Sequence, residues 1–154
     1  MTAVPAITRY FLIYRALPAR EQKVLLASLA LLPLFWLGLR LAGLQRFQAW
    51  LDCSPIARRA PLSQAEAAAL GVAVNRAANH VFGLVTCLTR SLVLRWLLRR
   101  YGTTSDLRIG VRFEQGEFAA HAWVEKDGIP VNDRPEVVAH FSAFDQPVSP
   151  EMFS

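Results

Sequence analysis

The longest apolar segment of the chain covers residues 24–39 and has no charged residue over its 16 positions. As a helix it would be about 24 Å long, whereas the hydrocarbon core of a bilayer is about 30 Å thick. Pro33 is expected to kink this helix. The segment follows 23 residues and precedes no clear small-residue cleavage site, which argues against a secretory signal. We therefore predict a helix over 20–50 that is buried or lies at a membrane surface, and favour it over a membrane span.

Helical spacing and helix-boundary residues predict further helices over 5–17, 63–78 and 87–102. Ser63 and Glu66 match a capping box, in which each side chain accepts a hydrogen bond from the other residue's backbone. Gly102 is well suited to end the third helix. Between the helix over 20–50 and the helix over 63–78, residues 52–62 contain Pro55 and Pro61 and are expected to link two parts of the chain. These parts are an apolar helical segment, 1–60, and a core domain, 61–154.

Alternating apolar and polar positions after residue 106 predict a short antiparallel sheet. Strands are expected over 107–113, 118–125 and 129–133. The turns that join them contain Gly116 and Lys126-Asp127-Gly128. The tail after Pro135 is expected to be irregular. An α+β fold follows, with the helices first and the sheet near the carboxyl end.

Composition and charge narrow the functional classes. Hydrophobic residues make up 53% of the chain and charged residues 19%, so a disordered chain is excluded. The net charge of +5 is uneven, because residues 1–112 carry a net +11 and residues 113–154 a net −6. The arginines are spaced along predicted helix faces without a nucleic-acid recognition motif. We expect a solvated helix face and no nucleic-acid partner, with anionic lipid or an acidic protein as the alternative.

The chain has two cysteines, Cys53 and Cys87. Their number and spacing describe neither a disulfide framework nor a zinc site, and they suit a reducing compartment such as the cytoplasm. Cys53 has no histidine pattern nearby and is expected to be an inert thiol. Cys87 is predicted at the start of a helix, where backbone donors stabilise a thiolate and can hold an oxyanion.

The histidine and carboxylate that activation of a thiol requires both follow Cys87 in the sequence. His121 lies in the block Ala-His-Ala-Trp-Val, and Asp133 follows Asn132 on the next predicted strand. A thiol needs a base to activate it, and the base needs an acceptor that fixes its tautomer. We therefore expect a cysteine hydrolase or acyl transferase with Cys87, His121 and Asp133 as its catalytic residues.

The length of the hairpin turn decides which acceptor meets His121. A two-residue turn at Asp127-Gly128 would place Arg134 opposite His121. A three-residue turn that includes Lys126 would place Asp133 there, within hydrogen-bonding reach. We favour the three-residue turn and Asp133, and retain Asn132 as the alternative because a Cys–His–Asn arrangement also works.

A family resemblance rests on six segments of the chain. They are 15–21 before the leucine-rich helix, Cys87-Leu88 with Arg90, 97–102, 109–112, 118–125, and Asp127-Gly128 with Asn132-Asp133. In these blocks the chain resembles the lasso-peptide biosynthesis B2 proteins, leader peptidases of the transglutaminase-like, papain-like superfamily. The resemblance implies a transglutaminase-like cysteine protease core. It implies that Cys87 is the nucleophile, His121 the general base and acid, and Asp133 the orienting carboxylate, with no cofactor or metal ion.

The resemblance also implies partners. The substrate would be a ribosomally made precursor peptide, whose leader is removed before a separate ATP-using, asparagine-synthetase-like cyclase closes the macrolactam. Some members carry a strand-rich leader-recognition domain, which the first 60 residues here do not resemble, so a separate recognition protein is expected. An export transporter is associated with such systems, and residues 20–50 are the segment expected to contact it or the membrane.

Two alternatives stay open. A transglutaminase or amidase would use the same three residues, with an amine instead of water resolving the thioester. A non-enzymatic scaffold would use residues 20–50 to dock maturation partners or a membrane, and it would not depend on His121.

Overall fold

The computed structural model describes residues 14–81, 85–114 and 116–143. Its elements are α2 (Ala19–Cys53), α3 (Gln64–Ala78), α4 (Cys87–Arg100), β1 (Asp106–Glu114), β2 (Glu117–Lys126), β3 (Ile129–Pro130), α5 (Val137–His140) and β4 (Ser142–Ala143). The four strands form one antiparallel sheet in the order β3-β2-β1-β4. The expected α+β class is confirmed. The helix expected over 5–17 lies mostly outside the described residues.

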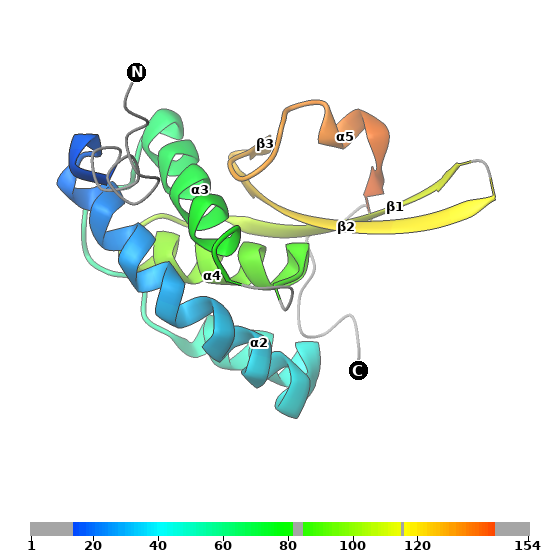
Figure 1. The fold of residues 1–154 in the computed structure, drawn as a ribbon, viewed down its shortest axis with the longest axis horizontal. Helices are drawn as coiled ribbons and strands as arrows, with labels where there is room; N and C mark the ends of the chain where they lie inside the picture. Colours follow the sequence, from blue (N-terminus) through cyan, green and yellow to red (C-terminus); the bar gives the residue numbers. More distant parts are fainter. Residues whose placement is uncertain (1–13, 82–84, 115, 144–154) are drawn as a thin grey trace, which may run out of the picture.

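The sheet separates two layers (Figure 1). α4 packs on one face of the sheet and is in turn packed by α2 and α3, and Leu70, Leu92 and Leu98 of α3 and α4 share one hydrophobic cluster with Leu107 and Val124 of the sheet. The segment that contains α5 lies on the other side and covers part of that face. The β1–β2 hairpin extends beyond the helices at the right of the figure. Residues of α2 belong to the same cluster, so the predicted segments 1–60 and 61–154 share a core.

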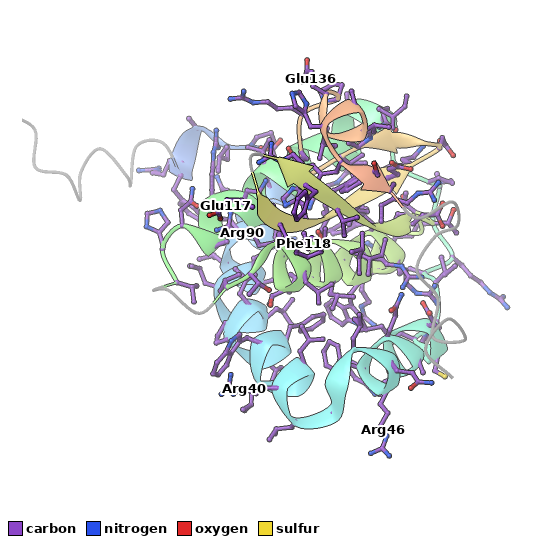
Figure 2. The ribbon with its side chains drawn as sticks, turned by 90° about the vertical axis from the view of Figure 1, so that its right-hand side faces the viewer. Arg40, Arg46, Arg90, Glu117, Phe118 and Glu136 are labelled. Carbon is purple, nitrogen blue, oxygen red and sulfur yellow. The ribbon has the colours of Figure 1, made fainter. Side chains whose placement is uncertain are left out.

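α2 changes direction at Gly43, not at Pro33. Gly43 has φ 76° and ψ 165°, a conformation that glycine adopts without the steric cost a Cβ would bring. Pro33 lies inside the helix without a local break. The two arms of α2 then pack together, and the ring centroids of Phe35 and Phe47 are 5.1 Å apart. Figure 2 shows the turn of α2 at the lower end of the molecule, near Arg40 and Arg46.

Among the described residues, α2 is the one helix long and apolar enough to cross a membrane by length and composition, a test that core helices of soluble proteins also pass. One face of its first arm is buried on the core through Val24, Leu32 and Phe35. However, only 22% of the most apolar 18-residue stretch of α2 is buried. The other faces leave leucines such as Leu34 (61% exposed) and Leu41 (78% exposed) uncovered. α2 is therefore both a core helix and a source of exposed apolar surface.

The capping box predicted at the start of α3 is confirmed. Ser63 Oγ accepts from the Glu66 backbone N–H at 3.2 Å, and Glu66 Oε2 accepts from the Ser63 backbone N–H at 2.8 Å. The Ser63 backbone bond, together with the Arg20 guanidinium 2.6 Å from the Glu66 carboxylate, lowers the pKa of Glu66. The ionised carboxylate therefore persists as the pH falls and ties the start of α3 to α2.

The turn between β2 and β3 has two residues, not three. Lys126 pairs with Ile129. Asp127 and Gly128, with φ of 51° and 77°, both adopt the positive values that a type I′ turn requires. The three-residue turn predicted from the sequence is therefore wrong.

The predicted third strand over 129–133 is also wrong, because β3 ends at Pro130. A longer strand in the observed register would have brought Arg134 opposite His121. Instead the chain bends over residues 131–133 and leaves the ladder. The tail is more regular than predicted, since α5 and β4 follow Pro135 before the described residues end at 143.

Candidate active site

Cys87 is the first residue of α4. Thr86 caps the helix, because its Oγ1 accepts a hydrogen bond from the Thr89 backbone N–H at 3.3 Å. The N–H groups of Cys87 and Leu88 have no partner within a helix, because they precede its first turn. The Cys87 thiol is free and half-buried. The helix start thus provides backbone donors beside a reduced sulfur, as the sequence predicts.

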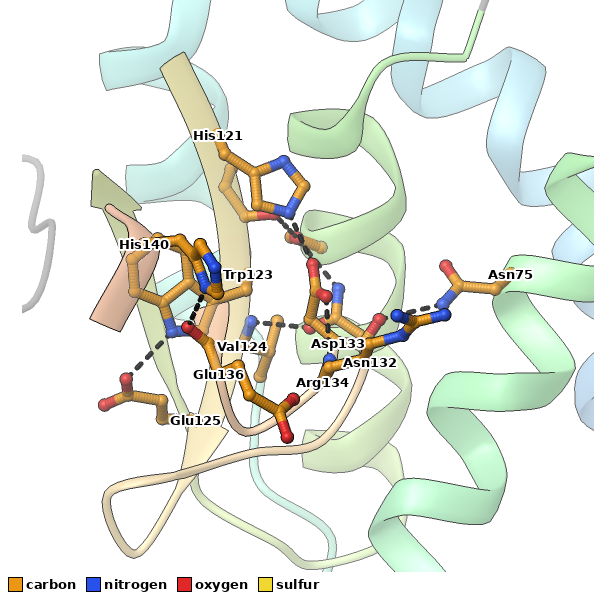
Figure 3. Close-up of polar contacts among 12 residues, drawn as sticks. Asn75, His121, Trp123, Val124, Glu125, Asn132, Asp133, Arg134, Glu136 and His140 are labelled. Atoms are coloured by element: carbon orange, nitrogen blue, oxygen red, sulfur yellow. Dashed lines mark hydrogen bonds and ion pairs between the residues drawn. The ribbon is translucent and has the colours of Figure 1, made fainter. Parts of the chain in front are cut away.

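His121 lies on β2, and its ring contacts the carboxylate of Asp133 directly. His121 Nε2 and Asp133 Oδ2 are 2.5 Å apart (Figure 3). The second carboxylate oxygen, Oδ1, accepts from the Arg134 backbone N–H at 2.7 Å. Because Asp133 is engaged at both oxygens, its carboxylate is held toward the ring. With Nε2 donating to Asp133, Nδ1 is the ring nitrogen left to accept a proton.

Asn132 holds the bend that brings Asp133 to His121. Its Oδ1 accepts from the Val124 backbone N–H at 2.8 Å, and its Nδ2 donates to Ser91 Oγ at 3.0 Å. Ser91 in turn donates to the Ala122 carbonyl at 3.0 Å. The Asn132 side chain therefore takes the place of a strand partner for β2 and faces α4, not His121. Asp133 is the residue in contact with the imidazole.

α3 supports the same bend from the other side. Asn75 Nδ2 donates to the Asn132 carbonyl oxygen at 2.8 Å (Figure 3). One turn earlier, Gly71 lies so close to the chain that a Cβ added there would be 1.9 Å from the Val131 carbonyl oxygen. Sequence reasoning missed Gly71, Asn75 and Ser91. The sequence does contain a signal for a close approach of two backbones here, because Gly71 is followed four positions later by the polar Asn75 within an alanine-rich helix.

The three predicted catalytic residues line one cleft of about 350 Å³. The lining residues are Asn75, Cys87, Arg90, His121, Ala122, Asn132 and Asp133. Arg90, one turn after Cys87, has a buried Nε with no hydrogen-bond partner among the described residues. A guanidinium placed this way can donate to a carbonyl or carboxylate oxygen of a bound molecule.

Two more clefts meet the first at Asp133. One, of about 360 Å³, is lined by Arg112, His121, Asp133, Arg134, Glu136, Val137, His140 and Phe141. The other, of about 420 Å³, runs along α3 past Ala68, Val72, Asn75 and residues 130–134. Because all three clefts include Asp133, the hollow surface passes over the His121–Asp133 pair instead of ending at it. Such a surface suits an extended molecule better than a small compact one.

Aromatic rings fix the outer side of His121. The ring centroids of His121 and Phe141 are 5.2 Å apart, and those of His121 and Trp123 are 6.2 Å apart. Trp123 is fully buried, and its indole N–H donates to Glu125 Oε1 at 2.8 Å. Arg108 forms an ion pair with the same carboxylate at 3.0 Å. The imidazole is therefore held by packing against the Trp123 and Phe141 rings as well as by Asp133.

Within the described ranges, no group of three or more His, Cys, Asp or Glu side chains is placed to hold a metal ion. The other cysteine, Cys53, is at the end of α2 and exposed. It is absent from the residues that line the three clefts described here.

A thiol at a helix start and an imidazole paired with a carboxylate, meeting at one cleft, are typical of cysteine-dependent hydrolases and acyl transferases. The family model of the transglutaminase-like superfamily matches residues 31–144, and the chain belongs to this superfamily. Its members generally have cysteine peptidase or transglutaminase activity. No significant match was found among curated proteins or solved structures. The match runs from the first arm of α2 past β4, so it includes every element of the site.

Proposed function

We propose that this protein is a cysteine peptidase that removes the leader peptide from a lasso-peptide precursor. The observation that carries the proposal is the meeting of Cys87 with the His121–Asp133 pair at one cleft. Membership of the transglutaminase-like superfamily supports the cysteine chemistry. The resemblance of the sequence blocks to the B2 leader peptidases supports the substrate class.

In the proposed reaction, His121 Nδ1 takes the thiol proton of Cys87, and the thiolate attacks the scissile carbonyl. Backbone N–H groups at the start of α4 stabilise the oxyanion. The imidazolium then gives its proton to the leaving amine, which frees the amino terminus of the core peptide. Water, deprotonated by His121, hydrolyses the thioester and releases the leader. Asp133 keeps the imidazole oriented and stabilises its charge in both steps.

The proposal includes three partners. A separate recognition protein would deliver the leader, and an asparagine-synthetase-like cyclase would use the freed amino terminus to close the macrolactam. The third partner is the membrane or a transporter in it, contacted through residues 20–50 from the cytoplasmic side. The exposed leucines of α2 and the cations Lys23, Arg40 and Arg46 support this contact.

The proposal is tested with the Cys87→Ala variant, the precursor peptide and the recognition protein, with products followed by mass spectrometry. Loss of leader removal is expected, because no other described cysteine lines the cleft. Cys53→Ala is the matched control and should cleave as the wild type does. Undiminished cleavage by Cys87→Ala would end the proposal.

The superfamily also favours a second candidate, a transglutaminase that transfers the acyl group to an amine. The two reactions share the acyl-enzyme and differ in what resolves it. Hydrolysis adds the mass of water across the cleaved bond, whereas amide transfer leaves a product joined to the amine. A non-enzymatic scaffold, by contrast, predicts that iodoacetamide labels Cys87 no faster than the exposed Cys53.

A further inference from the structure

Half of one edge of β2 is unpaired in the part of the chain that the structure describes. On this edge β3 pairs only with Glu125 and Lys126, whereas β1 pairs with β2 along nearly its whole length on the other edge. Phe118, at 66%, and Ala120 are exposed. Figure 2 views the molecule from the end at which the hairpin projects, and Phe118 is labelled there. An open edge of this kind is a template for another strand.

The hydrogen-bonding groups of this edge can be assigned from their neighbours. Val124 uses both its backbone N–H and its C=O on the β3 side, with partners in the segment after β3. The Ala122 carbonyl also points to this side, because it accepts from Ser91 on α4. Backbone groups alternate in direction along a strand. The N–H and C=O of Ala120 and Phe118 therefore point outward from the same edge.

The open part of the edge lies level with Cys87. α4 and β2 run in the same direction, since Ser91 contacts Ala122 and, further along both elements, Arg95 contacts Ser105 beside the end of β2. Cys87 precedes Ser91 by four helical residues, which is about 6 Å. Ala120 precedes Ala122 by two strand residues, which is about 6.6 Å. A strand paired with Ala120 would thus pass the nucleophile.

We propose that the substrate peptide binds as an added strand on the β2 edge at residues 118–120, which brings its scissile carbonyl to Cys87. This inference rests on the proposed function, because it assumes an extended peptide substrate. Main-chain hydrogen bonds supply the affinity in this mode of recognition and depend little on the peptide's side chains. The peptide continues the line of β3, where the Asn132 side chain and Ser91 end the existing pairing. The three clefts then receive its side chains.

The probe for this site is acetyl-tetraalanyl vinyl sulfone. The Cys87 thiolate adds to the vinyl carbon β to the sulfone, which is bonded to the Cα of the last alanine, and the carbon next to the sulfone takes up a proton, so no group leaves. Amide hydrogen exchange is then measured by NMR on the adduct and on protein capped with iodoacetamide. The amide protons of Phe118 and Ala120 should exchange at least about tenfold more slowly in the peptidyl adduct than in the capped protein. Those of Ala119 and His121 already bond to β1 and should be slow in both.

The two possible failures are distinguishable. If the probe labels Cys87 no faster than Cys53, the proposed function falls and this inference falls with it. If Cys87 is labelled but Phe118 and Ala120 exchange as fast as in the capped protein, strand addition alone is overturned.

A matched pair of variants provides a second measurement. Phe113 and Phe118 are direct partners across the hairpin, both are exposed, and their N–H groups point to opposite edges. Proline is tolerated where a strand's N–H faces solvent, so Phe118→Pro and Phe113→Pro should both fold, as circular dichroism would confirm. Phe118→Pro should slow labelling of Cys87 by the probe about tenfold, whereas Phe113→Pro should stay within about twofold of wild type. Equal rates for the two proline variants would overturn the inference.

Discussion

Asp133 and Asn132 are neighbours in sequence with different tasks in the structure. Asp133 contacts the imidazole of His121 and is partly exposed. Asn132 points the other way and satisfies the Val124 N–H and the Ser91 hydroxyl. A carboxylate stabilises a charged imidazolium, whereas a neutral amide that both donates and accepts can link two elements. This contrast makes substitutions at the two positions distinguishable.

Asp133→Asn should reduce kcat for leader removal by on the order of 10²-fold or more, because a neutral amide fixes the tautomer poorly and does not offset the imidazolium charge. The midpoint of thermal unfolding should change little, since the side chain is partly exposed. Single-turnover cleavage and thermal denaturation measure the two effects. A kcat equal to that of wild type would show that Asp133 does not orient His121 during the reaction.

Asn132→Ala is expected to destabilise the protein. The Val124 N–H and the Ser91 hydroxyl would both lose a partner, so the free energy of unfolding should fall by about 1–3 kcal/mol. Urea denaturation measures this loss. If Asn132→Ala unfolds at the wild-type urea midpoint, the amide does not tie β2 to α4.

At the scale of elements, α3 sets the position of the bend that presents Asp133. Gly71 lets the helix approach the backbone of residues 131–132, and Asn75 bonds the Asn132 carbonyl one turn later. The bend has no regular strand pairing of its own beyond the Val131 N–H, which donates to the Val124 carbonyl at 2.9 Å. Its place is therefore decided by the helix beneath it.

Gly71→Ala is expected to destabilise the protein, against the usual trend. In an exposed helix the substitution would stabilise by about 1 kcal/mol. Here the new methyl group would overlap the Val131 carbonyl and push the bend away, which lowers the unfolding midpoint and moves Asp133 from His121. Thermal denaturation and cleavage rates at low temperature test this. Arg76→Ala, at an exposed position of the same helix, is the control, and equal stability of the two variants would contradict the close approach.

At the scale of the whole molecule, α2 carries apolar side chains that the core does not cover. Val24, Leu32 and Phe35 bury one face, while Leu34 and Leu41 face outward. Figure 2 shows Arg40 and Arg46 at the end of the molecule where α2 turns. Apolar side chains flanked by cations suit the headgroup region of an anionic membrane.

The double variant Leu34→Glu/Leu41→Glu should bind anionic vesicles at least about fivefold more weakly than the wild type, because two carboxylates replace exposed apolar contacts. Co-sedimentation with phosphatidylcholine–phosphatidylglycerol vesicles measures the bound fraction. Val72→Glu, at an exposed position on α3, is the control. Equal sedimentation of the double variant and the wild type would exclude α2 as a membrane contact.

The sequence alone determined most of the elements, namely α2, α3, α4, β1 and β2, and the candidate chemistry. Local signals are short-ranged, so the capping box at Ser63 and the alternation over β1 and β2 predict the structure that forms there. The helix predicted to start at Cys87 is likewise found as α4.

Tertiary structure decided how these elements meet. The two-residue turn shifted the strand register by one, which should have removed Asp133 from His121. Contacts from α3 and α4, which are distant in sequence, instead bend residues 131–133 and bring Asp133 back into contact with His121. The reversal of α2 at Gly43 also depends on a contact between residues distant in sequence. Packing of Phe35 on Phe47 stabilises the positive φ of Gly43, which glycine adopts without steric cost. Register and turns depend on contacts between distant residues, and a local pattern does not contain those contacts.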